Sequence, residues 1–167
     1  HWGVHYVRGT IATYQREVAH AAVDAGVDLI IGHHPHELKG VEVYRGKAIF
    51  YSMGNFAFDL PLSLRQARQA LKPEKDLQVF TVDPDYADLY AWPSESRKSM
   101  IVSCTISNKL IESVSFLPVV INTKAQPVVV SDKRQVQEAL QNIEELSGSQ
   151  RLTTKFSIQG DKIVIAT

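Results

Sequence analysis

Three histidines stand within four positions, at His33, His34 and His36, directly after a short apolar segment. Residues 27–31 are nearly all apolar and often β-branched, which is typical of a strand buried on both faces. Gly32 ends this segment, and the end of a strand in an open α/β sheet is where such sheets place ligands. Neutral imidazoles grouped in this way bind a metal ion or contact an anion.

A packing or solvation role is the alternative to a binding role for these histidines. A single histidine beside a strand is usually packed or solvated. Three in four residues, with the rigid Pro35 between the last two, favour a metal or phosphate site instead. The sequence therefore predicts such a site at this edge of a sheet.

The residues before the histidines predict a helix between two strands. Residues 1–6 resemble the end of a strand, and Thr10 or Thr13 can cap a helix that extends to about Ala25. Gly26 stands where a left-handed residue often ends a helix. Apolar residues spaced by three and four predict the buried stripe of this helix: Ile11, Tyr14, Val18, Ala22 and Ala25. The order indicates a βαβ-like unit with a right-handed crossover.

A hairpin follows the histidines and leads to a second polar group. Residues 41–44 and 47–52 flank the turn signal Arg45-Gly46. The second strand ends at Gly54-Asn55, a pair that suggests a turn directing the amide toward the same rim as the histidines. Asn55 is expected either to bind a substrate there or to serve ordinary turn chemistry.

Residues 57–98 are the least regular part of the chain. A short helix is predicted over residues 62–71, ended by Pro73. A stretch of this length in a compact domain is usually a lid or an insertion. Its aromatic residues, Tyr90 and Trp92 among them, could cover a ligand or pack within the loop.

The remaining residues predict antiparallel strands and one further helix. Asn108-Lys109 joins two alternating segments into a hairpin, and residues 118–130 continue as extended chain with prolines typical of edge strands. Asp132 can cap a helix over residues 132–148. Its buried stripe is predicted to be Val136, Leu140, Ile143 and Leu146. Two short strands around Gly160-Asp161 close the chain.

Composition and charge bound the function classes. The 167 residues are enough for one domain with a core, and 44% apolar with 22% charged residues is the balance of an ordinary globular protein. Lysine plus arginine equals aspartate plus glutamate at 18 each, so no overall field draws the chain to nucleic acid or to an anionic membrane. Cys104 is the only cysteine, which excludes an intrachain disulfide and leaves the compartment open. No apolar run approaches the length of a transmembrane helix, and we expect no signal peptide within these residues. The chain starts at His1 without a methionine, and we expect it to be part of a longer protein.

Four motifs in order resemble one family. They are His1-Trp2-Gly3, Asp24-Ala25-Gly26-Val27-Asp28, Gly32-His33-His34-Pro35-His36 and Tyr51-Ser52-Met53-Gly54-Asn55-Phe56. Together they resemble the capsule-synthesis CapA (poly-γ-glutamate capsule, PGA_cap) proteins of the calcineurin-like metallophosphatase superfamily. The match is close over residues 1–59 and looser over residues 100–126.

The resemblance implies both a fold and a metal site. The fold is α/β (α+β), with residues 1–167 as a single domain or as the C-terminal half of a four-layer αββα sandwich with mixed sheets. In the superfamily a late histidine and a His-x-His pair complete a rim site that binds two divalent ions. Carried over, the metal ligands are His1, His34 and His36, and the ions would be Mn, Fe or Zn once the N-terminal half is present. The resemblance makes that missing half a partner of this chain.

Two departures from the family pattern bear on the chemistry. His5 stands where the family often has an acidic residue, so it could add a ligand or change the choice of metal. The N-terminal motifs that supply carboxylates are absent from these residues, which leaves only imidazoles. His33 lies one position out of register, so it could support a metal ligand without binding the ion itself, or could contact the substrate.

The resemblance implies a metal-dependent, phosphatase-like hydrolase with an incomplete site in this chain. His33 or His5 could protonate the leaving group, because imidazoles titrate near neutral pH, and Asn55 would orient a phosphoester or anionic polymer substrate. The family also implies an extracytoplasmic location at the cell envelope, with membrane contact only through segments outside this chain. The alternative is a non-catalytic component that binds polymer or assembles the capsule machinery, because a fold does not determine a function. A remnant without activity is a third reading.

Overall fold

The computed structural model describes residues 1–5, 7–57, 90 and 92–167. The helix predicted over residues 62–71 and most of the predicted lid or insertion lie outside these residues. In chain order the elements are α1 (Thr13–Asp24), β1 (Leu29–Ile31), β2 (Val41–Tyr44), β3 (Lys47–Phe50), the 3-10 helix η2 (Ser94–Arg97), β4 (Lys98–Ser107), β5 (Leu110–Ile121), β6 (Pro127–Val129), α3 (Lys133–Ser149), β7 (Phe156–Gln159) and β8 (Lys162–Ile165).

The first sheet has the order β1-β3-β2 and is mixed, with β1 parallel and β2 antiparallel to β3. The predicted hairpin is confirmed, because Arg45 and Gly46 both have left-handed backbone angles, as a two-residue turn requires. The prediction that residues 27–31 are buried on both faces is wrong. Ile31 is 46% exposed because β1 lies at the edge of this sheet among the described strands.

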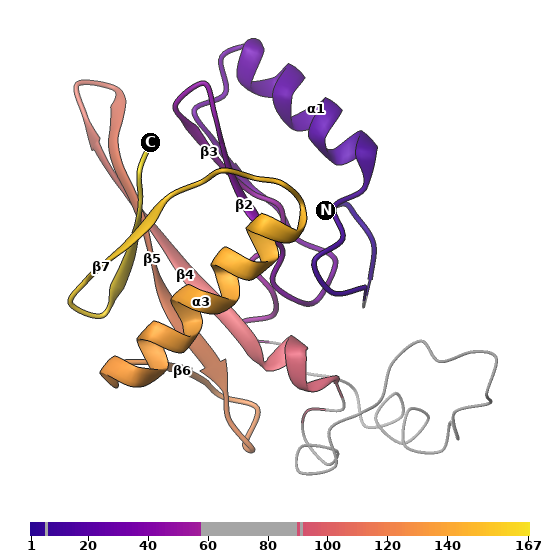
Figure 1. Cartoon of the computed structure of the whole chain (residues 1–167), viewed down its shortest axis with the longest axis vertical. Coiled ribbons are helices and arrows are strands. Elements are labelled where there is room, and N and C mark those ends of the chain that lie inside the picture. Colours follow the sequence, from indigo (N-terminus) through magenta and orange to yellow (C-terminus); the bar gives the residue numbers. More distant parts are fainter. Residues whose placement is uncertain (6, 58–89, 91) are drawn as a thin grey trace, which may run out of the picture.

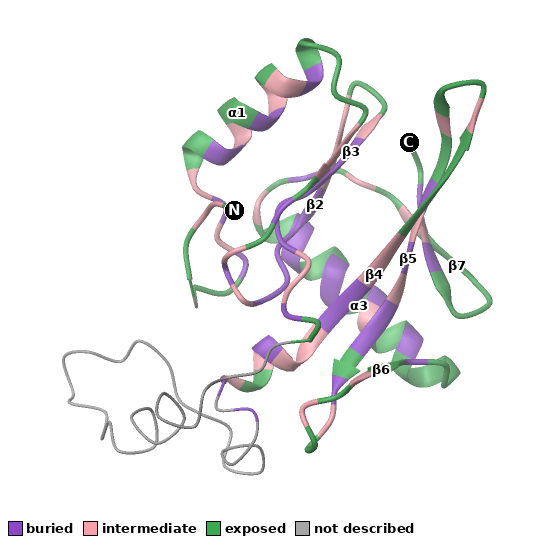
Figure 2. Cartoon of the chain, turned by 180° about the vertical axis from the view of Figure 1, so that it is seen from behind, coloured by how far each residue is buried: buried purple, intermediate pink, exposed green. Residues whose placement is uncertain are grey.

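The second sheet has the order β4-β5-β8-β7, with β6 also paired to β5, and all of its pairs are antiparallel. Asn108 and Lys109 both adopt left-handed angles at the predicted turn between β4 and β5. The strands around Gly160 are also as predicted. Figure 2 shows that the hairpin end of β4 and β5 is mostly exposed, while their other halves carry the buried residues of both strands.

Helix α1 forms where the sequence predicts it, but with a different cap and a different buried face. Ala12 precedes the helix, and the side chain of Gln15 accepts a hydrogen bond from its backbone amide, in place of a threonine cap. Tyr14 and Val18, which belong to the predicted stripe, are about half exposed. The buried residues of the helix are Gln15, Ala19 and Val23. The strand predicted for residues 1–6 is not found in the described part of that segment.

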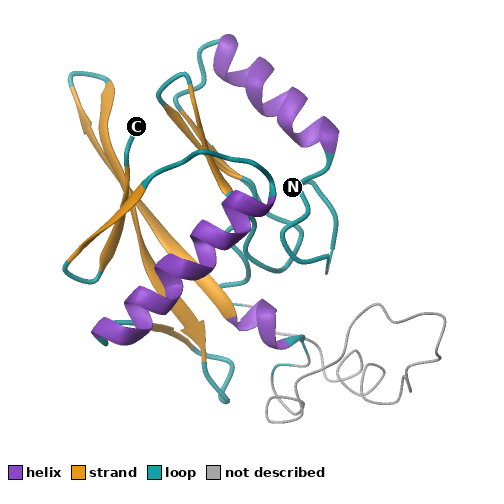
Figure 3. Ribbon diagram, viewed as in Figure 1, coloured by secondary structure: helices purple, strands orange, loops and turns teal. Residues whose placement is uncertain are grey.

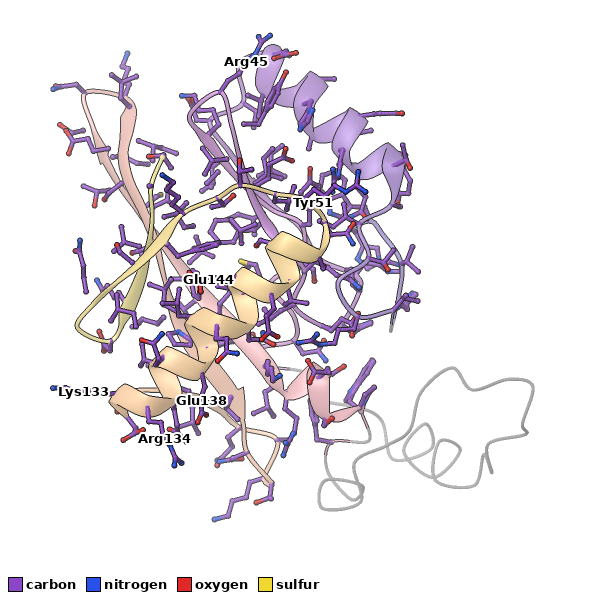
Figure 4. All side chains as sticks on the ribbon, in the orientation of Figure 1. Arg45, Tyr51, Lys133, Arg134, Glu138 and Glu144 are labelled. Atoms are coloured by element: carbon purple, nitrogen blue, oxygen red, sulfur yellow. The ribbon has the colours of Figure 1, made fainter. Side chains whose placement is uncertain are left out.

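Helix α3 confirms its prediction in detail. The Asp132 side chain accepts hydrogen bonds from the amides of Arg134 and Gln135, both at 3.1 Å. The four predicted stripe residues are all buried. Arg134 and Glu138, one turn apart, form an ion pair on the exposed side of the helix near its beginning (Figure 4).

The main core lies where the first sheet, the second sheet and α3 meet. The rings of Phe50 and Phe116 join the two sheets edge to face, with centroids 6.5 Å apart. Helix α1 covers the other face of the first sheet through Ile49 and Tyr51 (Figures 1 and 3). The α/β class is confirmed. None of the helices in the described part of the chain combines the length and the apolar character needed to span a membrane.

Candidate metal centre

Two loops carry the histidines, and main-chain hydrogen bonds hold them together. The amide of Trp2 donates to the carbonyl of His33 at 3.0 Å, and the Trp2 indole donates to the carbonyl of Tyr51 at 3.0 Å. The amide of Met53 donates to the carbonyl of Gly32 at 3.1 Å. The segment that begins at His1 is therefore fixed against the loop that follows β1.

Four imidazole rings converge in this arrangement. His34 Nδ1 and His1 Nε2 are 2.7 Å apart and share a hydrogen bond. The His5 ring lies against His34 with centroids 3.9 Å apart and is 5.6 Å from that of His36. The centroids of His34 and His36 are 6.5 Å apart. The structure thus brings together His1, His34 and His36, the three predicted ligands, and adds His5 to them.

The backbone of the His-Pro-His segment is strained. His34 has a φ angle of 106° and His36 has a φ angle of 61°, in a region of backbone conformation that residues other than glycine rarely adopt. Each such residue costs on the order of 1–3 kcal/mol, and strain of this kind concentrates at ligand sites. With this backbone, the rings of both residues contact the loop that carries His1 and His5.

His36 is held by an amide and covered by an indole. Its Nδ1 lies 2.7 Å from Asn55 Oδ1, and its ring centroid lies 4.4 Å from that of Trp92. Asn55 is buried and also donates from Nδ2 to the Tyr90 hydroxyl at 2.7 Å. Asn55 therefore lies in the site as predicted, but its amide is engaged by protein groups. Its contact with a substrate stays a prediction.

His33 differs from the other histidines of its motif. Its side chain is exposed, and its carbonyl serves the Trp2 amide. Among the described residues its ring has no hydrogen bond or ring contact. The remaining histidine, His20, belongs to another cluster, where it pairs with Glu42 at 3.0 Å and stacks on Tyr44.

A buried ion pair underlies the site and was not predicted. Lys39 is 1% exposed and Glu37 is 5% exposed, and their charged groups are 2.5 Å apart. Lys39 Nζ also donates to the carbonyl of Val7 at 2.6 Å. The pair therefore joins the loop that carries His36 to the loop that carries His5. The sequence does not predict this buried ion pair, because charged residues that alternate with an apolar one, here Leu38, are usual on a protein surface.

The electrostatics favour a neutral ring at the centre of the group. Desolvation lowers the pKa of His34 below its usual value, and the nearby charges of His5 and His36 lower that pKa further. A neutral imidazole is the form that binds a metal ion.

The donors present fit a transition-metal ion in kind but not in number. Imidazole nitrogen suits Mn, Fe and Zn. However, the described residues include no group of three or more histidine, cysteine, aspartate or glutamate side chains placed to hold a metal ion. His1 and His34 bond to each other, and His36 bonds to Asn55.

Comparison with known proteins places the first third of the chain. Residues 1–60 match the family described as bacterial capsule synthesis protein PGA_cap. The PGA biosynthesis protein CapA of Bacillus subtilis is 54% identical over 59 residues, and the capsule biosynthesis protein CapA of Bacillus anthracis is 51% identical over 59 residues. A probable polyglutamine synthesis accessory protein of Mycobacterium tuberculosis is 39% identical over the same length.

These matches cover only a small part of this chain and of each relative. Each covers 35% of this chain, and the chain covers 15%, 14% and 15% of the three relatives respectively. The matched segment contains both histidine loops, α1, the first sheet and Asn55. The resemblance to the capsule-synthesis (PGA_cap) family is therefore confirmed, over residues 1–60 of this chain.

Proposed function

We propose that the protein takes part in the biosynthesis of a capsule polymer, and that its histidine-rich edge is the imidazole part of a metal-dependent, phosphatase-like hydrolase site. The names of the relatives support the pathway. The convergence of four imidazoles from two separate loops is the observation that carries the chemistry. A strained backbone at two of those residues supports it further.

In this proposal His1, His34 and His36 hold one or two divalent ions of Mn, Fe or Zn. A bound ion would polarise the scissile group and lower the pKa of a water. The ligands in this chain are all imidazoles. The carboxylate ligands would come from an N-terminal segment of the same domain, which is the proposed partner of this chain. The strained loop holds His34 and His36 ready for that partner.

Two histidines are proposed to move protons. His5 lies against His34, and the side chain of His33, the neighbouring residue in the sequence, is exposed. An imidazole titrates close to neutral pH and can donate a proton to a leaving group. Asn55, whose Oδ1 accepts a hydrogen bond from His36 Nδ1 at 2.7 Å, would fix the orientation of that ring and thereby support substrate placement.

The proposed substrate is a phosphoester or an anionic polymer such as poly-γ-glutamate, handled outside the cytoplasm at the cell envelope. Both the substrate class and the location rest on the family resemblance. With equal numbers of acidic and basic residues, attraction of such a polymer would depend on the local group of imidazoles rather than on net charge.

Substitution of His34 and His36 together by alanine is expected to lower the metal content of the full-length protein at least tenfold. Two of three imidazole donors would be lost, and each metal site depends on its full donor set. Elemental analysis of purified protein measures the metal, and assays with phosphodiester and γ-glutamyl amide substrates measure turnover. His20→Ala removes an imidazole from the other cluster and should leave both unchanged.

Wild-type metal content in the double variant would contradict the proposed site. Metal-free wild-type protein that still binds poly-γ-glutamate, with capsule output unaffected by the double substitution, would instead support the non-catalytic alternative. If the double variant loses its metal but the wild type shows no turnover, the metal site is supported and the proposed hydrolase activity is contradicted.

A further inference from the structure

We infer that Tyr90 is a positioning residue that fixes, through Asn55, which ring nitrogen of His36 carries the proton. Four groups form one chain of hydrogen bonds: the Ser96 carbonyl, the Tyr90 hydroxyl, the Asn55 amide and the His36 ring. The direction of each bond in this chain is set by the bond before it. The histidine loop and the segment around Tyr90 are far apart in the sequence, and this chain of hydrogen bonds connects them.

The donor and acceptor roles along these hydrogen bonds are set first at Ser96. A carbonyl oxygen can only accept, so the Tyr90 hydroxyl donates its single hydrogen to Ser96 at 2.6 Å. The Tyr90 oxygen can then only accept from Asn55, which must present Nδ2 to it at 2.7 Å. This orientation of the amide follows from the chemistry of the partners, because the opposite orientation would place two acceptors together.

The second step passes from Asn55 to His36. With Nδ2 directed to Tyr90, Asn55 presents Oδ1 to His36 Nδ1 at 2.7 Å. An amide oxygen can only accept, so Nδ1 must carry the hydrogen. In the neutral ring the lone pair is then on Nε2. The carbonyl of Ser96, at one end of this series of hydrogen bonds, thereby selects the tautomer of His36 at the other end.

Burial makes the selection effective. Ser96 is fully buried, Tyr90 is 1% exposed and Asn55 is 5% exposed, so bulk water has little access to these groups. An unmade hydrogen bond in such a place costs more than the same bond is worth at the surface. Trp92, also 1% exposed, packs against the His36 ring and limits its rotation.

This inference deepens the proposed function and rests on it only for the use of Nε2, which would be the nitrogen offered to a metal ion. The tautomer itself does not depend on a metal. A protein with the predicted tautomer and no metal would refute the proposed function alone. A protein that binds metal with the other tautomer would refute this inference alone.

The test is nuclear magnetic resonance of the imidazole nitrogens in protein labelled with ¹⁵N at histidine, with chelator present and at about pH 9, well above the ordinary imidazole pKa of about 6.5. Comparison with His36→Gln assigns the signals. We expect a pyrrole-type Nδ1 and a pyridine-type Nε2 for His36 in the wild type. Tyr90→Phe removes the acceptor of the Asn55 amide, and we expect the ratio of the two tautomers to shift about tenfold toward Nε2–H.

Rescue separates positioning from a purely structural role. A carboxylate can only accept, so adding Asn55→Asp to Tyr90→Phe should restore the Nδ1–H tautomer without the tyrosine. Tyr44→Phe, at the His20 cluster, should leave the His36 signals unchanged. A wild-type His36 with Nε2 protonated would overturn the inference whether or not any variant folds. A ratio unchanged in Tyr90→Phe, or not restored in the double variant, would also overturn it.

Discussion

Replacement of Gly32 by alanine is expected to destabilise the protein by about 3 kcal/mol, the upper part of the usual range for overpacking. A Cβ at this position would lie against the carbonyl of Tyr51, 2.5 Å from Trp2 Nε1 and 2.7 Å from the carbonyl of Phe50. Two of these atoms are backbone, and the third is fixed by its hydrogen bond to Tyr51. No neighbour can move without breaking the pairing of β1 with β3 or the contact of Trp2.

Denaturant unfolding of Gly32→Ala and Gly148→Ala measures this effect against a matched control. An added Cβ at Gly148, within α3, would meet no atom within 4 Å. Alanine is favoured over glycine inside a helix by roughly 0.5–1 kcal/mol, so the control should be slightly stabilised. Equal stabilities of wild type and Gly32→Ala would show that the end of β1 has room for a methyl group, which contradicts the close packing around Gly32.

Replacement of Lys39 by methionine is expected to cost about 3–5 kcal/mol, because it leaves the buried carboxylate of Glu37 without its partner. The carbonyl of Val7 also loses the donor 2.6 Å away. Methionine keeps most of the volume and length of the lysine side chain, so the change removes mainly the charge and the hydrogen bonds. The loop with His1 and His5 loses a tie to the loop with His36, and we expect the imidazole group to disperse.

The double variant Glu37→Gln, Lys39→Met distinguishes charge from packing. With both charges removed, no uncompensated ion is left, and a large part of the lost stability should return. Unfolding free energies of the two single variants and the double variant give the coupling between the residues. Additive effects would mean that the two side chains do not form the buried pair.

Some elements could be predicted because their signals are local. Asp132 needs only the amides two and three residues away, and Asn108-Lys109 needs only its own backbone angles, so the α3 cap and the β4–β5 turn are confirmed. The prediction of the buried face of α1 was wrong, because two sets of apolar residues in this helix share the same helical spacing. Tertiary packing chose Ala19 and Val23, with a buried Gln15 in the first turn, over Tyr14 and Val18.

The site divides in the same way. His34 and His36 follow from a local pattern, whereas His1 was identified only by family resemblance, since it lies 33 residues from its bonding partner. Tyr90 was noted as an aromatic residue but not as the partner of Asn55, 35 residues away. Lys39 reads as a surface lysine until the carbonyl of Val7 is placed beside it. Each of these requires knowledge of which loops meet.

Anomalous X-ray diffraction from crystals of the full-length protein grown with Mn²⁺ or Zn²⁺ would locate an ion bound by the histidine loops. We expect a peak at bonding distance, about 2.0–2.2 Å for zinc, from ring nitrogens of His1, His34 and His36. A map in which those three rings are well ordered and no metal lies among them would contradict it.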